Sequence, residues 1–234
     1  MLRCAPIAAL VLAGAAAGPV LAADSGRPVV IELFESQGCS SCPPANANLI
    51  RFAERKDALA LTFAVDYWDN LGWKDTFARP EFTARQWAYA KALRHSEVFT
   101  PQIVVNGRLD GTGLEDGEMA GLASRADRGA SGPELTFEAG AVRIAAGSAP
   151  PQGADVWLAL YQPGVVEAAV RRGENAGRTL PHVNVVRQIV RLGKWSGEAE
   201  RLPLPAAAPE LAQAVLVQAA DAGPILAAAS DGAR

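Results

Sequence analysis

Two cysteines separated by two serines, Cys39-Ser40-Ser41-Cys42, are the side chains in this sequence best suited to covalent chemistry. The apolar run at 28–34 predicts a strand, and residues 42–55 carry apolar side chains at helical spacing. Cys39 is therefore expected at the N-terminus of a helix, where unpaired backbone N–H groups and the helix dipole favour thiolate over thiol. We predict that Cys39 is an accessible, ionised sulfur that attacks disulfides.

Cys42 lies one helical turn beyond Cys39, close enough to form a disulfide with it and less exposed. In this scheme Cys39 forms a mixed disulfide with a client, and Cys42 resolves it. Two other interpretations of the pair stay open, a structural disulfide and half of a metal site. Zinc usually takes four ligands, whereas the mature chain offers two Cys and two His, so we predict no metal and no cofactor.

A second signal is Thr100-Pro101, directly before the apolar strand expected at 102–105. A cis X–Pro bond at this place would face the cysteine pair and offer backbone groups to an extended substrate segment. The alternative is a trans proline that begins a strand. We predict that Pro101 belongs to the catalytic site and that Thr100 contacts the substrate.

Acidic side chains near the cysteines are candidates for accepting the proton of Cys42. Strand alternation places Glu32 on one sheet face with Val30 and Phe34, and we prefer it to Glu35 as the proton shuttle. The sequence is equally consistent with a second interpretation, in which Glu32 is a solvent-exposed carboxylate on the strand. Residues 59–65 predict a second buried strand, and Asp66, which follows it, is a further candidate.

Three aromatic side chains, Tyr67, Trp68 and Trp73, lie in a loop that leaves a strand end, where α/β folds usually place binding sites. We predict that they form an apolar wall for a substrate chain, with packing of the following helix as the alternative. His95 is expected to pair with the negative end of that helix. His182 could complete a copper site if it met the two cysteines.

The order of predicted elements is that of an α/β unit followed by a β-rich unit. Helices are expected at 80–93, with Phe82, Trp87 and Ala90 inward, and at 114–126. Asn106-Gly107 predicts a hairpin turn into an antiparallel strand at 108–111. Small residues at 129–133 indicate a boundary, after which strands with a period of two are expected at 135–137, 142–144, 156–161, 165–170, 183–192, 215–218 and 225–229.

The first residues are typical of an export signal, with Arg3 at the positive end and an apolar run at 7–17. Cleavage is predicted after Ala22 or Ala23, which removes Cys4, and the alternative is a membrane anchor. The mature chain then has no membrane span and a periplasmic or secreted location, where a disulfide persists. The net charge of −3 and the absence of a Lys/Arg cluster argue against nucleic acid as a partner.

Six motifs together resemble one family of secreted thioredoxin-like proteins, catalogued as domain of unknown function 1223. They are ELFESQGCSSCPP at 32–44, VDYWD at 65–69, LGWKD at 71–75, TPQ at 100–102, VNG at 105–107 and RGENAGR at 172–178. The resemblance covers essentially the whole mature chain and implies a thioredoxin-like fold and a periplasmic location. In the last motif we expect a tight turn with Glu174 and Arg178 paired locally.

The prediction for the whole chain is a signal peptide at 1–23, an α/β thioredoxin-like domain at 27–130, and a β-sandwich-like domain at 133–234. We predict an exported thiol–disulfide oxidoreductase that acts on a protein thiol or disulfide client. The predicted catalytic residues are Cys39, Cys42, Pro101 and Glu32, and the predicted substrate-binding residues are Thr100, Tyr67, Trp68 and Trp73. The alternative is a copper-binding or redox-inert interaction protein on the same fold.

Overall fold

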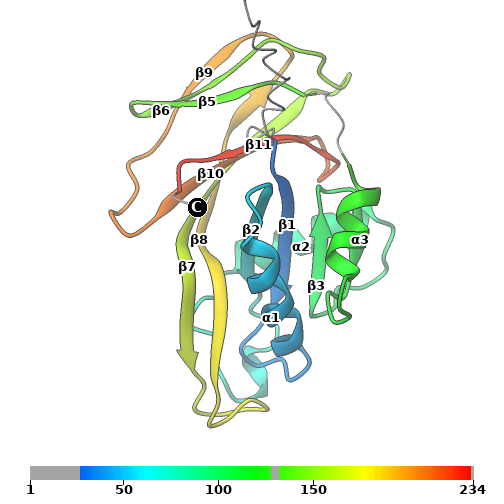
Figure 1. Ribbon diagram of the computed structural model, residues 1–234, viewed down its shortest axis with the longest axis vertical. Helices are drawn as coiled ribbons and strands as arrows, with labels where there is room; N and C mark the ends of the chain where they lie inside the picture. Colours follow the sequence, from blue (N-terminus) through cyan, green and yellow to red (C-terminus); the bar gives the residue numbers. More distant parts are fainter. Residues whose placement is uncertain (1–26, 128–131, 233–234) are drawn as a thin grey trace, which may run out of the picture.

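The computed structural model describes residues 27–127 and 132–232, and the predicted leader with its cleavage site lies outside them. The fold is mixed α/β, with one large mixed sheet and a second small sheet (Figure 1). The large sheet has eight strands in the order β11-β10-β7-β8-β2-β1-β3-β4, and the small one has three in the order β5-β6-β9. Within the described ranges, no helix is both long enough and apolar enough to cross a bilayer.

The first half of the chain supplies one edge of the large sheet and, within the described residues, the three α-helices. Its elements are β1 (Val29–Glu35), α1 (Cys42–Ala53), β2 (Ala58–Ala64), the 3-10 turn η1 (Asp69–Leu71), α2 (Pro80–Ala92), β3 (Gln102–Val105), β4 (Leu109–Gly111) and α3 (Glu118–Arg125). β1 and β2 are parallel, and β3 and β4 form the antiparallel hairpin predicted from Asn106-Gly107. Asn106 has φ 49° and Gly107 has φ 62°, which is the left-handed backbone that this turn requires.

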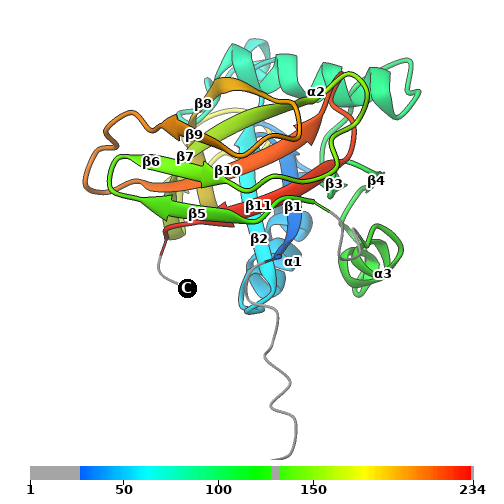
Figure 2. The same cartoon turned by 90° about the horizontal axis from the view of Figure 1, so that it is seen from above.

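Strand β1 is buried on both faces, and its alternation sorts the helices into layers. Ile31 and Leu33 pack with α1 and α3 on one face of the sheet. Val30 and Phe34 pack with α2 on the other face. Figure 2 shows α2 on the opposite side of the sheet from α1 and α3. The predicted alternation of β1 is thereby confirmed.

The second half of the chain contributes strands to both sheets. Its elements are β5 (Leu135–Glu138), β6 (Ala141–Ile144), β7 (Ala154–Ala169), β8 (Thr179–Trp195), β9 (Glu200–Pro203), β10 (Ala212–Ala219) and β11 (Ile225–Ser230). β7 and β8 form a long antiparallel hairpin that bends through bulges, so that two separately predicted strands are one strand, β7. The small sheet packs on β7 and β10 through a core that includes Val142, Val156 and Val215.

The two halves meet at β2 and β8, which pair in parallel at Thr62 and Val185. The Thr62 hydroxyl donates to the Val183 carbonyl oxygen at 2.6 Å, and Asn184 Nδ2 donates to the Ala60 carbonyl oxygen at 2.9 Å. Four strands of the second half, β7, β8, β10 and β11, therefore continue the sheet of the first half, whereas β5, β6 and β9 form the small sheet.

Two helix predictions need correction. Trp87 was expected to face the core, but 49% of it is exposed. The inner face of α2 instead carries Arg85 and Gln86, which are buried because each has a polar partner on the sheet. α3 begins at Glu118, four residues later than predicted, because Gly117 before it has φ 81° and ends a turn.

Candidate functional site

Cys39 and Cys42 form a disulfide at the beginning of α1, with their Cα atoms 5.5 Å apart. Cys39 belongs to a turn in which its N–H donates to the Ser36 carbonyl oxygen at 3.0 Å, and Cys42 is the first helical residue. Prolines follow at 43 and 44, where a first helical turn needs no N–H donors. The predicted strand–turn–helix arrangement around the pair is therefore present.

The exposure of the pair differs from the prediction. Cys39 is 0% exposed and Cys42 is 1% exposed, whereas the two serines between them face solvent. The turn points the Cys39 sulfur inward, where the Ser41 hydroxyl lies 3.3 Å from it. The prediction of an accessible sulfur at Cys39 is therefore wrong for the disulfide form, because the turn presents its serines and not its sulfur to the outside.

The tip of the β7–β8 hairpin holds the turn that carries Cys39. Asn175 is 0% exposed, and its Nδ2 donates to the carbonyl oxygens of Gln37 and Cys39 at 3.0 and 2.9 Å. Glu174 Oε2 accepts the Ser40 N–H at 3.3 Å, and Arg178 donates to Asn175 Oδ1 at 2.7 Å. Figure 1 shows this tip at the same end of the molecule as the start of α1. Glu174 and Arg178 are thus not paired with each other, since each bonds to another partner.

The Thr100-Pro101 segment lies against the cysteine pair. The peptide bond between them is cis, and the Ser41 hydroxyl donates to the Thr100 carbonyl oxygen at 3.4 Å. Trp68 Nε1 donates to Thr100 Oγ1 at 2.8 Å. Two segments that are far apart in the sequence are thereby brought together as expected.

The three predicted aromatic residues are half-buried around this site. Trp73 Nε1 donates to Gln37 Oε1 at 2.9 Å, so it supports the turn that precedes Cys39. The Tyr67 and Trp68 ring centroids are 6.4 Å apart, and burial raises the pKa of Tyr67. Trp68 and Trp73 therefore tie the loop after β2 to the two segments that carry the cysteines and Thr100.

Glu32 is not brought to the cysteine pair. Its carboxylate is 0% exposed and accepts two bonds from Arg85, at 2.5 and 2.9 Å, and one from the Tyr89 hydroxyl at 2.6 Å. These partners are on α2, across the sheet from α1 and Cys42. The structure thus gives Glu32 a buried ion pair, neither the solvated position nor the place at the cysteines that the sequence suggested.

The other polar residues named from the sequence are also accounted for. Asp66 accepts a bond from the Thr83 hydroxyl at 2.6 Å, at the start of α2. His95 is expected to pair with the helix end, but its Nε2 lies 2.7 Å from Asp110 Oδ2, so a carboxylate is its closest partner. Both residues therefore bond to partners other than the cysteines.

A buried polar cluster near the start of α1 contains residues that sequence reasoning did not choose. Glu35 and His182 are both 0% exposed, with Glu35 Oε1 3.3 Å from His182 Nδ1. Asn46 on α1 donates to Glu35 Oε2 at 3.4 Å. Alternation along β1 puts Glu35 on the same face as Ile31 and Leu33, the α1 face, and this signal could have preferred it to Glu32.

Asp75 adds a further buried carboxyl to the cluster. It accepts the N–H groups of Gln37 at 2.6 Å and Phe77 at 2.8 Å. Burial, and next the charge of Glu35, raise its pKa to about 6. Burial alone would lower the pKa of His182, but Glu35 and then Asp75 outweigh it and hold that pKa above its ordinary value.

The described residues include no group of three or more His, Cys, Asp or Glu arranged to hold a metal ion. His182 lies with Glu35 and Asp75, and the sulfurs of Cys39 and Cys42 are bonded to each other. The three-ligand copper arrangement considered for His182 is therefore not assembled in this disulfide form.

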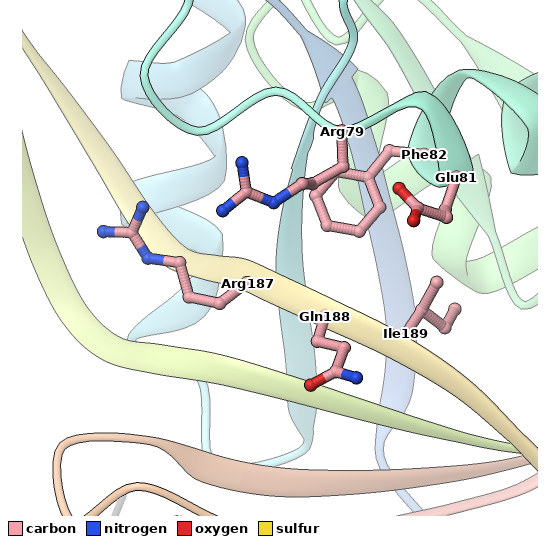
Figure 3. Close-up of a pocket in the computed structure, with 6 residues that line it drawn as sticks. All are labelled: Arg79, Glu81, Phe82, Arg187, Gln188 and Ile189. Atoms are coloured by element: carbon pink, nitrogen blue, oxygen red, sulfur yellow. The ribbon is translucent and has the colours of Figure 1, made fainter.

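A hollow of about 370 Å³ opens between the start of α2 and β8, and it contains none of the predicted site residues. It is lined by Arg79, Glu81, Phe82, Arg187, Gln188 and Ile189 (Figure 3). The Arg187 guanidinium lies 4.3 Å from the ring centre of Phe77, and the ring centres of Phe77 and His182 are 5.5 Å apart. The pKa of Arg187 is lowered, mainly by burial and secondly by the positive charge of Arg79. Phe77 thus contacts one residue that lines this hollow and one residue of the buried cluster.

Comparison with known proteins places the chain in a family. A crystal structure of protein AGR_C_4864 from Agrobacterium tumefaciens is similar, with 31% sequence identity and a TM-score of 0.72. The alignment covers 86% of this chain and 92% of that one. None of the curated proteins matches the chain. The family model described as protein of unknown function (DUF1223) matches residues 30–218, and the chain belongs to that family.

Proposed function

We propose that this protein is an exported thiol–disulfide oxidoreductase whose first half is a thioredoxin-like unit and whose β-rich second half packs like a sandwich. The observation that carries the proposal is the Cys39–Cys42 disulfide at the first turn of α1, against the Thr100-Pro101 segment. A sulfur at a helix N-terminus is a good leaving group and a good nucleophile, because the unpaired N–H groups and the helix dipole favour its thiolate. The predicted leader is the basis for proposing a periplasmic or secreted location.

The proposed reaction is exchange with a protein client that carries a dithiol. A client thiolate attacks Cys39 Sγ, forming the mixed disulfide while the Cys39–Cys42 bond breaks and Cys42 takes the electron pair. A second client thiolate then attacks the client sulfur and releases Cys39. In the reverse direction Cys42 resolves the mixed disulfide. The aromatic residues Tyr67, Trp68 and Trp73 are proposed to bound the client segment.

The burial of the pair adds a requirement to this reaction. Both cysteines are at most 1% exposed, so a client reaches Cys39 only after the turn that carries it opens. The bonds that hold the turn are those from Asn175 to Gln37 and Cys39 and from Ser40 to Glu174. We propose that client binding replaces these bonds at the hairpin tip.

The test is the redox behaviour of the pair together with trapping of the mixed disulfide. Wild-type protein is equilibrated in glutathione buffers of graded potential, and free thiols are counted by mass spectrometry after alkylation. The Cys42→Ala variant, with Cys39 first converted to its mixed disulfide with glutathione, is incubated with a reduced, unfolded client protein. Cys39→Ala, treated in the same way, is the matched control. We expect the wild-type disulfide to be reduced reversibly. We expect a covalent client adduct in Cys42→Ala and not in Cys39→Ala, and dithiothreitol should release it.

A redox-inert structural disulfide is the second candidate, and the complete burial of both sulfurs favours it. It predicts that the pair stays oxidised across all glutathione buffers and that no adduct forms. It also predicts that the Cys39→Ala/Cys42→Ala double variant only loses stability, by about 2 kcal/mol for so short a loop. That set of results would refute the oxidoreductase proposal.

A further inference from the structure

The sealed position of the disulfide creates a proton problem when it is reduced. Cys42 leaves as a thiolate, and it is 1% exposed. A buried thiolate lacks water to stabilise it, so burial favours the neutral thiol. A protein group close to Cys42 therefore has to supply the proton at the moment when the S–S bond opens.

The buried pair Glu35–His182 has the chemistry for this task. Its carboxylate and imidazole approach to 3.3 Å between Oε1 and Nδ1, and both side chains are fully enclosed. Among the described residues, Glu35 Oε1 and both His182 ring nitrogens lack a well-formed hydrogen bond. Buried polar atoms almost always have a hydrogen-bond partner, so three neighbouring buried atoms without a well-formed bond call for an explanation. An ionisable pair that exchanges a proton provides one.

Helix α1 connects the pair to Cys42. Asn46 is four residues after Cys42, so the two side chains are neighbours on one face of the helix, and both are buried. Asn46 Nδ2 donates to Glu35 Oε2 at 3.4 Å, and Asn46 Oδ1 has no hydrogen-bond partner among the described residues. Asn46 thus connects Glu35 to the helical turn that begins with Cys42.

Other charges face the pair from the loop after η1 and from β8. Asp75 is the nearest acid, and its charge and that of Glu35 act on each other and on His182. Arg187 on β8 is the cation that acts in the opposite direction on His182, with the Phe77 ring between the two. The two acids outweigh this cation and the burial, so the pKa of His182 lies above its ordinary value. These charges therefore favour the protonated form of the imidazole.

We propose that Glu35 and His182 hold the proton that Cys42 takes up when the disulfide is reduced and returns when it reforms. The proposal rests on the oxidoreductase function proposed above. In the forward step a client thiolate bonds to Cys39 Sγ, the Cys39–Cys42 bond breaks, and its electron pair goes to Cys42 Sγ. The proton of the pair moves to that sulfur, leaving the Glu35 carboxylate and a neutral His182. In the reverse step the proton returns to the pair as Cys42 attacks the mixed disulfide.

The test is the pH dependence of disulfide opening by a small dithiol. The rate of reduction by dithiothreitol is measured from pH 5 to 9 and divided by the concentration of its thiolate. For the wild type we expect this rate to fall as pH rises through the pKa of His182, because the proton donor is lost. His182→Gln and Glu35→Gln should be slower by about 100-fold at pH 7, with the inflection removed.

His95→Gln is the matched control, because it removes the other of the two histidines, which is 36% exposed and paired with Asp110. It should keep the wild-type profile. A measurement on wild-type protein guards against a variant that fails to fold. The NMR titration of the His182 ring, assigned by comparison with His95→Gln, should have its midpoint at the kinetic inflection.

The possible outcomes separate the two proposals. A wild-type pair that glutathione cannot reduce refutes the oxidoreductase function itself. A pair that is reduced reversibly, but with the same pH profile in His182→Gln and Glu35→Gln, refutes only the role of the Glu35–His182 pair. A His182 midpoint away from the kinetic inflection refutes that role as well.

Discussion

Glu32 and Glu35 are three residues apart on β1, and this odd spacing puts their carboxylates on opposite faces of the sheet. Glu32 meets Arg85 and Tyr89 of α2, while Glu35 meets His182 and Asn46 on the α1 side. Burial of a carboxylate is tolerated only with partners, and each face supplies different ones. Alternation alone could have separated the two acids, but Arg85 and His182 are distant in sequence and could not be foreseen as partners.

The Glu32–Arg85 pair is expected to be structural. Glu32→Gln leaves the buried Arg85 guanidinium without its anion, so we predict a loss of about 3–5 kcal/mol in the free energy of unfolding. Chemical denaturation checks the stability, and glutathione equilibration checks that the reduction potential of the cysteines is unchanged. Arg55→Ala, which breaks an exposed pair with Asp57, is the control and should cost less than about 1 kcal/mol. If Glu32→Gln shifted the reduction potential of the cysteines without changing the stability, Glu32 would have a role in the redox reaction and not in the fold.

Asp75 makes stability depend on pH. Its folded pKa is about 6 against 3.8 when unfolded, so the folded state binds more protons between these values. Stability therefore falls as pH rises through that window, by about 3 kcal/mol in all. Asp75→Asn should remove this slope while losing about 1–3 kcal/mol at pH 4, because the amide NH₂ cannot accept both N–H bonds. Urea titrations at pH 4 to 7 measure both effects.

The matched control for loss of one acid is Asp116→Asn, whose carboxylate is 91% exposed. It should keep the wild-type slope. If Asp75→Asn keeps that slope too, the ionisation of Asp75 is not what couples stability to pH in this range.

Among the elements, the β7–β8 hairpin has the most direct hold on the cysteine turn. Asn175→Ala removes two buried hydrogen bonds, to Gln37 and Cys39, and leaves both carbonyl oxygens without that donor. We predict that the turn opens more often and that a dithiol reduces the disulfide about 10-fold faster, the equivalent of about 1.4 kcal/mol. Stopped-flow reduction followed by thiol labelling measures the rate.

Arg172→Ala is the control for this prediction, because Arg172 is exposed on the same hairpin tip. Its reduction rate should equal that of the wild type. An unchanged rate in Asn175→Ala would show that the hairpin does not limit access to Cys39.

Sequence periodicity predicted a helix or strand well where one face of the element, or both faces, are buried. The strands β1, β2 and β3 and the helices α1 and α2 were predicted within a few residues, because long apolar patterns and prolines mark them. Strand β9 was missed, since only alternate residues of Glu200–Pro203 are half-buried and no apolar run marks it. Trp87 was placed inward because its apolar character outweighed Arg85, whose burial depends on a partner from β1.

At the scale of the whole molecule, the sequence predicted two units, and the structure joins four strands of the second unit to the sheet of the first. Composition and small residues at 129–133 indicated a boundary, but strand pairing between distant segments leaves no local pattern. The candidate site depends on this joining, since His182 and Asn175 come from the second half and Glu35 and Cys39 from the first. The proximity of the cysteines and Thr100 was predictable from motif order, whereas the contribution of β8 was not.

The shared sheet predicts that the two halves unfold together. α2 packs on strands from both halves in one continuous core, and β2 and β8 are joined by the Thr62–Val183 bond. Calorimetry of the oxidised protein should show one transition whose calorimetric and van't Hoff enthalpies agree. Thr62→Val, which leaves the Val183 carbonyl oxygen without this donor, should lower the midpoint of that single transition and cost about 1–2 kcal/mol.

Thr136→Val on the small sheet is the control, because its hydroxyl accepts only an exposed bond from Arg143. Its effect should stay within about 0.5 kcal/mol. Two separate transitions in the wild type, or a second one appearing in Thr62→Val, would mean that the halves fold as independent domains. The cysteine site would then be assembled by docking of two domains, and the His182 contact to Glu35 would be lost when the less stable of them unfolds.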